Sequence, residues 1–214
     1  MRILGLDAAF AGCSVAVSED GSLRAERQAA AARGQSAVLA TLLGEVLRAA
    51  PGRIDLVAVM IGPGGFTGLR AAIALAQGFA LGRGAAITGI TLAEALAEAL
   101  PAPPEGVFWV ALPRRLGGVF LDGLDATRGG FDLAALPSPP EAVTLAGEAE
   151  ALVAARLDAA GIRVRCTGLR DPSARLVAAA AFRRAVAGAP PRPAQPVYAE
   201  PPAAIAASAR PPPA

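Results

Sequence analysis

Hydrophobic positions near the start of the chain alternate with polar ones. Residues 2–7 form an apolar run that ends in an acid, and residues 13–18 and 23–28 alternate apolar and polar side chains. Asp20-Gly21, between the last two runs, is a hairpin signal. The pattern therefore predicts three antiparallel strands.

The period then changes to that of a helix. Over residues 35–49 apolar side chains recur every three or four positions, and Pro51-Gly52 ends the run. Residues 55–61 are apolar almost throughout, which is typical of a parallel strand covered on both faces. A glycine-rich turn follows. The next predicted elements are a helix over 67–81, a strand over 85–89 and a helix over 91–99.

The order βββαβα over residues 1–81 is the core order of a ribonuclease-H-like or actin-like half-domain. After the proline-rich residues 101–104 a smaller α/β set follows. It comprises strands over 106–112, 117–124, 143–146 and 162–167, and helices over 148–159 and 173–187. We therefore expect an α/β, actin-like ATPase (ASKHA, ribonuclease-H-like) fold that is duplicated, with a reduced second half.

The same pattern predicts three parts of the chain. Residues 1–104 form the N-terminal half, and residues 105–187 form the reduced C-terminal α/β half. Residues 188–214 hold nine of the 19 prolines, so we expect an extended tail without regular structure at its end.

Composition removes several classes of chemistry. The 214 residues include no histidine, lysine or asparagine, and all 20 positive charges are arginine. Catalysis by Ser-His-Asp or Cys-His, histidine-ligated zinc, Schiff-base chemistry and a P-loop lysine are therefore excluded. Codon bias in an alanine-rich, arginine-rich chain is the simpler origin of the missing residue types, but the exclusions hold either way.

Charge is unevenly distributed. Residues 1–150 carry 11 Arg against 15 acids, and residues 151–214 carry nine Arg against three. The basic end could meet RNA or an acidic protein, or it could be an ordinary solvated face. Two cysteines without metal-binding spacing, and apolar runs too short to cross a membrane, indicate a cytoplasmic protein with no membrane partner.

The most specific segment is the glycine turn at residues 61–70. It follows a buried strand and opens a helix, so its backbone N–H groups could hold an anion. It is not a P-loop, because Thr67 stands where a glycine is needed and no lysine follows. Alternatively, the glycines only permit a tight reversal, with Thr67 as the helix N-cap. The wide apolar faces of this helix and of the 35–49 helix indicate either a shared interface or core packing alone.

GPGGFTGLR in this turn resembles the signature GPGSFTGLR of the bacterial TsaB (YeaZ) family, with Gly65 where serine is usual. The opening RILGLDAAFAGCSVAV is similar to the family's RILAIDTSTxxCSVAL, and TLAEALAEA at 91–99 resembles its SSLEALA helix. Val197-Tyr198 matches the closing PxYLR. The resemblance is strong over residues 1–100 and weak beyond about 125.

The resemblance implies a role in making threonylcarbamoyladenosine (t6A) in tRNA. It implies a non-catalytic subunit that dimerises with and activates a TsaD-like transferase through N-terminal helices, with a TsaE-like ATPase joining them. The protein alone would form a homodimer through the same surface, and tRNA would be met through the complex. It is not expected to be a peptidase, because the paralogue's metal site needs two histidines.

Two departures from the family weaken nucleotide chemistry. Asp7-Ala8-Ala9 replaces Asp-Thr-Ser, and Leu112-Pro113 replaces Asp-Ala, so the paired acids that hold Mg²⁺ on a nucleotide are missing. We expect no cofactor and no metal, with ATP/Mg²⁺ at most weakly held or bound by partners. The candidate residues of a vestigial nucleotide site are Asp7, Gly64 and Thr67.

These observations predict two further sets of site residues. The expected tRNA-facing residues are Arg183 and Arg184. The expected partner interface consists of Val38, Leu42, Val46, Phe66, Thr67, Leu69, Arg70 and Ile73.

The alternative function is an ASKHA-type nucleotide-binding phosphotransferase or ATPase.

Overall fold

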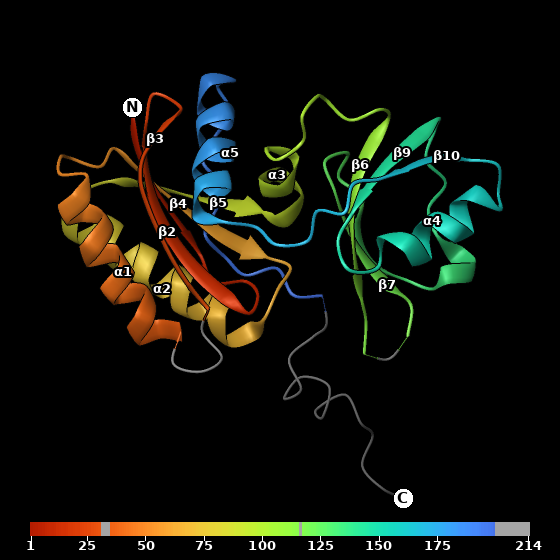
Figure 1. Cartoon of the computed structure of the whole chain (residues 1–214), viewed down its shortest axis with the longest axis horizontal. Helices are drawn as coiled ribbons and strands as arrows, with labels where there is room; N and C mark the ends of the chain where they lie inside the picture. The colour runs from red at the N-terminus through yellow and green to blue at the C-terminus, as the bar shows by residue number, and fades with distance from the viewer. Residues whose placement is uncertain (31–34, 116, 200–214) are drawn as a thin grey trace, which may run out of the picture.

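The chain folds around two five-stranded sheets (Figure 1). The structure is a computed structural model, and it describes residues 1–30, 35–115 and 117–199. The first sheet has the order β3-β2-β1-β4-β5. Its strands are β1 (Arg2–Asp7), β2 (Gly12–Glu19), β3 (Ser22–Ala30), β4 (Leu56–Gly62) and β5 (Ala86–Thr91).

Strand directions in the first sheet follow the predicted pattern. β1, β2 and β3 pair antiparallel, and β4 and β5 are added parallel beside β1. The predicted hairpin turn is confirmed, because Asp20 and Gly21 both have positive φ, 49° and 80°. All seven residues of β4 are buried, as the unbroken apolar run predicts.

Helices cover both faces of the first sheet (Figure 1). On one face, α1 (Gln35–Ala49) and α2 (Phe66–Arg83) pack side by side against the strands. On the other face lie α5 (Ala174–Val186) and the short α3 (Leu92–Ala97). At Gly5 of β1 the α5 backbone comes so close that a Cβ would overlap the Ala174 carbonyl oxygen. A glycine at this position therefore sets the spacing between α5 and the sheet.

The second sheet has the order β10-β9-β6-β7-β8 and carries α4 (Glu150–Asp158) on its outer face (Figure 1). Alternate residues of β6 divide between two cores: Phe108 and Val110 face α3, whereas Trp109 packs toward α4. The strands are β6 (Val107–Pro113), β7 (Val119–Gly123), β8 (Arg128–Phe131), β9 (Ala142–Ala146) and β10 (Arg163–Cys166), with a 3-10 turn η1 (Leu133–Ala135).

One apolar core joins the two sheets. It contains Ile3 and Met60 of the first sheet, Phe108 and Val110 of the second, and Val177 of α5. The predicted part 105–187 assigned α5 to the second half, but the helix packs against β1, β2 and β4 of the first sheet. The reason is that its buried alanine-rich face fits the close approach at β1. That boundary is therefore wrong for α5.

Local differences from the predicted elements are few. β8 and η1 lie between residues 124 and 143, where the sequence pattern predicts no element, because β8 contains two glycines and η1 has only three residues. Thr67 is not the N-cap of α2: the helix begins at Phe66, and its N-cap Gly65 makes no side-chain cap bond. The helix ends at Arg83 and is capped by Gly84, which has a left-handed conformation and whose amide donates to carbonyls of the last turn.

The first part of the predicted tail is ordered against the first sheet. Residues 189–198, called the C-terminal strap below, run along the edge of β5 toward the start of α2. The amide of Gly89 donates to the carbonyl of Arg192, and the amide of Val197 donates to the carbonyl of Ile61. The end of the tail, residues 200–214, lies outside the described residues.

Candidate functional site: the outward face of α1 and α2 and the Asp7 pocket

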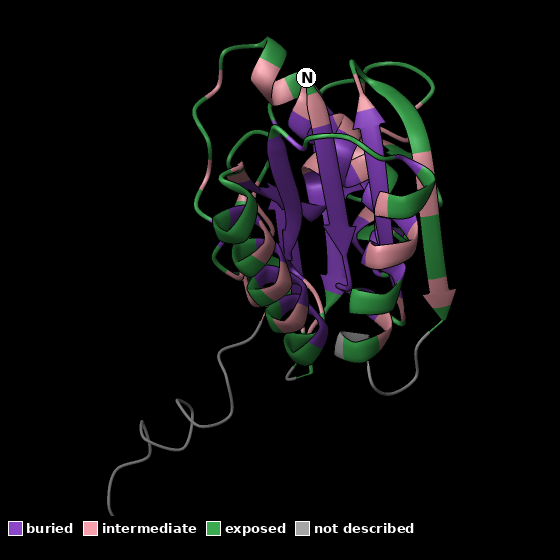
Figure 2. Ribbon diagram, turned by 90° about the vertical axis from the view of Figure 1, so that its left-hand side faces the viewer, coloured by how far each residue is buried: buried purple, intermediate pink, exposed green. Residues whose placement is uncertain are grey.

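The outward surface of α1 and α2 carries few charges and many small side chains. Seen from this side, the outward turns of both helices are exposed or half-buried, and the central strands behind them are buried, whereas the edge strand β3 is largely exposed (Figure 2). We call it the α1–α2 face. It comprises Val38, Thr41 and Glu45 of α1 and Arg70, Ala74, Gly78 and Leu81 of α2.

The α2 half of this face is flat and open. A Cβ added at Gly78 or Gly82 would meet nothing within 4 Å, and the Leu81 side chain is 87% exposed. Between Arg70 and Arg83 the helix has no charged residue. An exposed apolar helix surface of this kind is typical of a protein-binding site.

Four of the predicted interface residues face inward instead. Leu42, Val46 and Ile73 belong to the core between the helices and the first sheet, and Leu69 belongs to the core shared with α5. The prediction that they contact a partner directly is therefore wrong for this structure. On an amphipathic helix the large apolar side chains form the stripe that packs on the sheet. Choosing interface residues by their apolar character therefore selects core positions.

The other four predicted interface residues lie at the surface. Phe66 is 42% exposed, Thr67 and Arg70 are exposed, and Val38 is half-buried. Whether they bind a partner stays a prediction, but their placement leaves them available for contact.

Phe66 and Arg70 form a cluster with Tyr198 of the strap. The rings of Phe66 and Tyr198 stack with centroids 5.2 Å apart and an interplanar angle of 29°. The Arg70 guanidinium carbon lies 3.8 Å from the Phe66 ring centroid, and Nε donates to the Tyr198 hydroxyl over 2.8 Å. Residues 128 positions apart in sequence are thus joined at the N-terminal end of α2.

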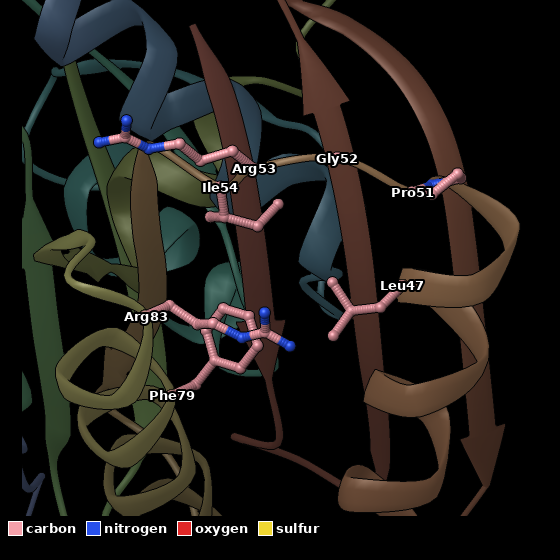
Figure 3. A pocket seen from close by; sticks show the side chains of 7 residues that line it. All are labelled: Leu47, Pro51, Gly52, Arg53, Ile54, Phe79 and Arg83. Atoms are coloured by element: carbon pink, nitrogen blue, oxygen red, sulfur yellow. The ribbon is translucent and has the colours of Figure 1, made fainter.

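A hollow of about 370 Å³ lies at the opposite end of the two helices (Figure 3). Leu47 of α1 and Phe79 of α2 face each other across it, and Ile54 lies above Phe79 in this view. Arg83 extends from α2 beside Phe79, and its guanidinium carbon lies 5.8 Å from that ring centroid. Arg53 also lines the hollow, but its guanidinium points away from the Phe79 ring in this view. The hollow therefore has apolar walls and a basic rim.

Asp7 lines a separate pocket of about 430 Å³ at the end of β1. Its side chain is 4% exposed and accepts a 3.0 Å hydrogen bond from the Ala9 amide. Burial raises the pKa of Asp7 to about 6; the Ala9 bond opposes this rise, and the charge of Asp171 adds to it. The pocket therefore holds one carboxyl group that can be protonated near neutral pH.

The candidate nucleotide residues do not converge on one site. Gly64 and Thr67 do not line the Asp7 pocket. The glycine turn instead closes on Ala9: the Gly65 amide donates to its carbonyl over 2.6 Å, and a Cβ on Gly64 would lie 2.6 Å from the same oxygen.

The residues present do not fit a magnesium-bound nucleotide. A phosphate would need the N–H groups and the space that Ala9 occupies at the glycine turn. Among the described residues, no group of three or more Asp, Glu, Cys or His side chains could hold a metal ion. That no cofactor binds stays a prediction.

The two arginines expected to face tRNA are both engaged with carboxylates. Arg183 pairs with Glu98 at 2.7 Å, and Arg184 pairs with Glu94 at 2.9 Å. The Arg184 side chain is only 22% exposed, which leaves little of it to meet RNA. No helix in the described ranges is long and apolar enough to span a membrane.

A charged hub that the sequence pattern does not predict lies under the strap. Glu94 accepts hydrogen bonds from Arg184 and Arg192, and also from the amide of Thr91, whose hydroxyl caps α3 in return. Burial raises the pKa of Glu94, but its bonds to Arg192 and Thr91 and the charge of Arg184 outweigh burial and lower it. The capping-box pattern TxxE was the available signal, whereas the distant arginines left none.

Comparison with known proteins relates the N-terminal half to t6A proteins by sequence. Residues 28–110 match the family model described as TsaD, tRNA N6-adenosine threonylcarbamoyltransferase. The chain is also 32% identical over 100 residues to the tRNA threonylcarbamoyladenosine biosynthesis protein TsaB of Escherichia coli. That alignment covers 46% of this chain and 43% of the E. coli protein, less than half of either.

Solved structures extend the likeness to almost the whole chain. YeaZ from Pseudomonas aeruginosa matches with a TM-score of 0.72 at 20% identity, over 92% of this chain and all of that one. A further P. aeruginosa protein, described as similar to peptidase YeaZ, matches with a TM-score of 0.70 at 22% identity, over 93% and 99%. A ROK hexokinase from Thermus thermophilus matches more distantly, with a TM-score of 0.52 at 15% identity over 85% and 98%.

These structural likenesses show the fold, which is the expected actin-like ATPase (ASKHA) fold. Part of the chain is thus similar in sequence to TsaB and to the TsaD family model, and the YeaZ structures share its fold over almost its whole length.

Proposed function

We propose that the chain is a non-catalytic subunit in t6A biosynthesis that binds a TsaD-type transferase through the α1–α2 face and activates it. The observation that carries the proposal is this face itself: it is exposed, nearly uncharged along α2, and built from side chains small enough for a second helix to approach closely. Its place in t6A synthesis rests on the similarity to TsaB.

The residue types of the chain favour a non-catalytic role. The sequence has no histidine or lysine, and Asp7 is a buried carboxyl group with a raised pKa whose pocket is lined by one other acid among the described residues, the exposed Asp171. Such a group cannot by itself hold a metal and a phosphate. We therefore assign the transfer of the threonylcarbamoyl group to the partner's active site.

The remaining partners form part of the same proposal. A TsaE-like ATPase would join the pair, tRNA would be reached through the complex, and the chain alone would form a homodimer through the α1–α2 face. Self-association and partner binding would then compete for one surface. The proposal places this assembly in the cytoplasm.

Ala74→Arg tests the proposal. Ala74 is exposed near the middle of α2, so arginine fits there without entering the core but blocks close helix approach. Ala155→Arg is the matched control, because Ala155 is exposed on α4 of the second sheet. Mixed with the cognate TsaD-type protein on a sizing column, wild type and Ala155→Arg should co-elute with it and Ala74→Arg should not. Co-elution of Ala74→Arg would refute the α1–α2 face as the interface.

The alternative predicted from the sequence is a nucleotide-binding phosphotransferase or ATPase. Calorimetry with ATP and Mg²⁺ on wild type and Asp7→Asn separates it from the proposed function. We expect no measurable heat of binding for either protein. Binding by wild type that Asp7→Asn abolishes would instead favour the enzyme.

A further inference from the structure

We infer that the C-terminal strap completes the partner surface: Tyr198 fixes the guanidinium of Arg70 over Phe66, so that Arg70 receives a carboxylate of the partner. This inference rests on the proposed function, because it names what one end of the α1–α2 face recognises. It adds a segment from the other end of the chain to that surface.

The strap is anchored before it reaches Tyr198. The side-chain amide of Gln77 donates to the carbonyl of Ala194 over 3.1 Å, and Ala194 is buried. The amide of Val197 donates to the carbonyl of Ile61 over 2.7 Å, immediately before the glycine turn. Tyr198 is therefore held by its backbone as well as by its ring.

Arg70 is oriented, but it has no acidic partner among the described residues. Its Nε donates to the Tyr198 hydroxyl and its flat face covers Phe66, and no carboxylate of the described residues lies within ion-pair distance of it. The two Nη groups thus remain as a pair of donors. Arg128 and Arg192, in contrast, already pair with Asp122 and Glu94. Two parallel N–H donors match the two oxygens of a carboxylate.

The surroundings specify a carboxylate on a protein rather than a nucleic acid. Phe66 is 42% exposed beside the guanidinium, and Ala74 lies one turn further along the same helix face. Backbone binding by RNA depends on several cations together, whereas here one arginine stands beside apolar surface. The partner group is therefore an Asp or Glu bordered by apolar side chains.

Ordering by the strap gives Arg70 its value in binding. A free arginine loses much rotamer freedom when it pairs, and a guanidinium already held by a ring and a hydroxyl loses less. Removing the Tyr198 hydroxyl should thus weaken binding only through Arg70.

The test measures affinity for the cognate TsaD-type protein by calorimetry, with full-length chains. We expect Arg70→Gln to weaken binding about tenfold or more, as loss of a hot-spot charge does. We expect Tyr198→Phe, which keeps the ring, to weaken it about threefold, in line with one hydrogen bond. The double variant should bind no more weakly than Arg70→Gln, because both changes act through one guanidinium. Losses that multiply in the double variant would overturn the inference.

Arg83→Gln is the matched control. Arg83 also lies over a phenylalanine four residues earlier on α2, whereas Tyr198 of the strap contacts Arg70. We expect it to change affinity less than Arg70→Gln; equal losses would show a general charge effect and overturn the inference. Loss of tRNA binding in Arg70→Gln with unchanged TsaD-type affinity would overturn it too.

The outcome for Ala74→Arg separates this inference from the proposed function. If Ala74→Arg abolishes binding but the Arg70 and Tyr198 variants bind like wild type, the inference alone fails. If Ala74→Arg binds like wild type, the proposed function fails and the inference with it. Thermal unfolding of each variant shows whether it is folded.

Discussion

Asp7 occupies the position of the acid in the signature that the sequence resembles, but its surroundings differ from that signature. Two alanines follow it where the resemblance leads one to expect hydroxyls, and its oxygen accepts from the Ala9 amide instead. The sequence alone could indicate the loss of the hydroxyls. The sequence could not predict that the Ala9 carbonyl also accepts a hydrogen bond from the Gly65 amide, because that contact depends on how two turns far apart in sequence fold together.

The raised pKa of Asp7 makes stability depend on pH. Its pKa is about 6 in the folded chain against an ordinary 3.8, so its protonated form is favoured by folding. This contribution is fully present below pH 3.8 and is lost as the pH rises through 6, amounting to about 3 kcal/mol. We expect the unfolding free energy of wild type minus that of Asp7→Asn to fall by about that amount between pH 4 and pH 7. Denaturant titrations at each pH measure it, and parallel pH profiles would contradict it.

Glu94 supports a second prediction at the same scale. Glu94→Gln removes the charge that pairs with Arg184 and Arg192 in a site where the Glu94 side chain is 16% exposed. We expect the unfolding free energy to fall by about 2 kcal/mol at neutral pH, because two guanidiniums lose a charged acceptor.

Glu98→Gln serves as the control for Glu94→Gln. Glu98 pairs with Arg183, whose side chain is 71% exposed, so the loss should stay below about 1 kcal/mol. Equal losses in the two variants would show that the Glu94 hub is no stronger than a surface pair. Both are measured by denaturant unfolding.

At the scale of elements, two glycines that the sequence does not distinguish have opposite structural roles. Gly5 in β1 admits the backbone of α5, whereas Gly78 in α2 faces open space. Hydrophobic periodicity placed both elements correctly, since strands and helices repeat with different periods. It could not separate the two faces of α2, because alanine and glycine fit a core, an interface or solvent equally well.

Gly5→Ala and Gly78→Ala test this distinction as a pair. At Gly5 the new Cβ would overlap the Ala174 carbonyl, so α5 must shift and the unfolding free energy should fall by about 1–3 kcal/mol. At Gly78 the added methyl meets nothing, and helix propensity should raise it by up to about 1 kcal/mol. Denaturant unfolding of both variants measures the signs, and destabilisation by Gly78→Ala would contradict an open α2 surface.

At the scale of the whole molecule, the chain crosses between the two sheets more than its sequence shows. α5 follows β10 of the second sheet but packs on the first, and the strap continues along β5 to α2. The order of the half-domain could be predicted because its elements follow one another along the sequence. The return of α5 and of the strap to the first sheet could not be predicted. An alanine-rich helix and a proline-rich segment have no sequence pattern that indicates which element they pack against.

We expect the shared core to make the two sheets unfold as one cooperative unit. Ile3 and Met60 of the first sheet touch the same core as Phe108 and Val110 of the second, so neither sheet can unfold without exposing the other. Trp109, the single tryptophan, lies in the second sheet and reports on it by fluorescence. We expect its denaturant midpoint to coincide with that of far-ultraviolet circular dichroism. Gly5→Ala, in the first sheet, should shift both midpoints together. A Trp109 midpoint that stays fixed while the dichroism shifts would mean that the halves unfold separately, and the joint core would then contribute little to stability.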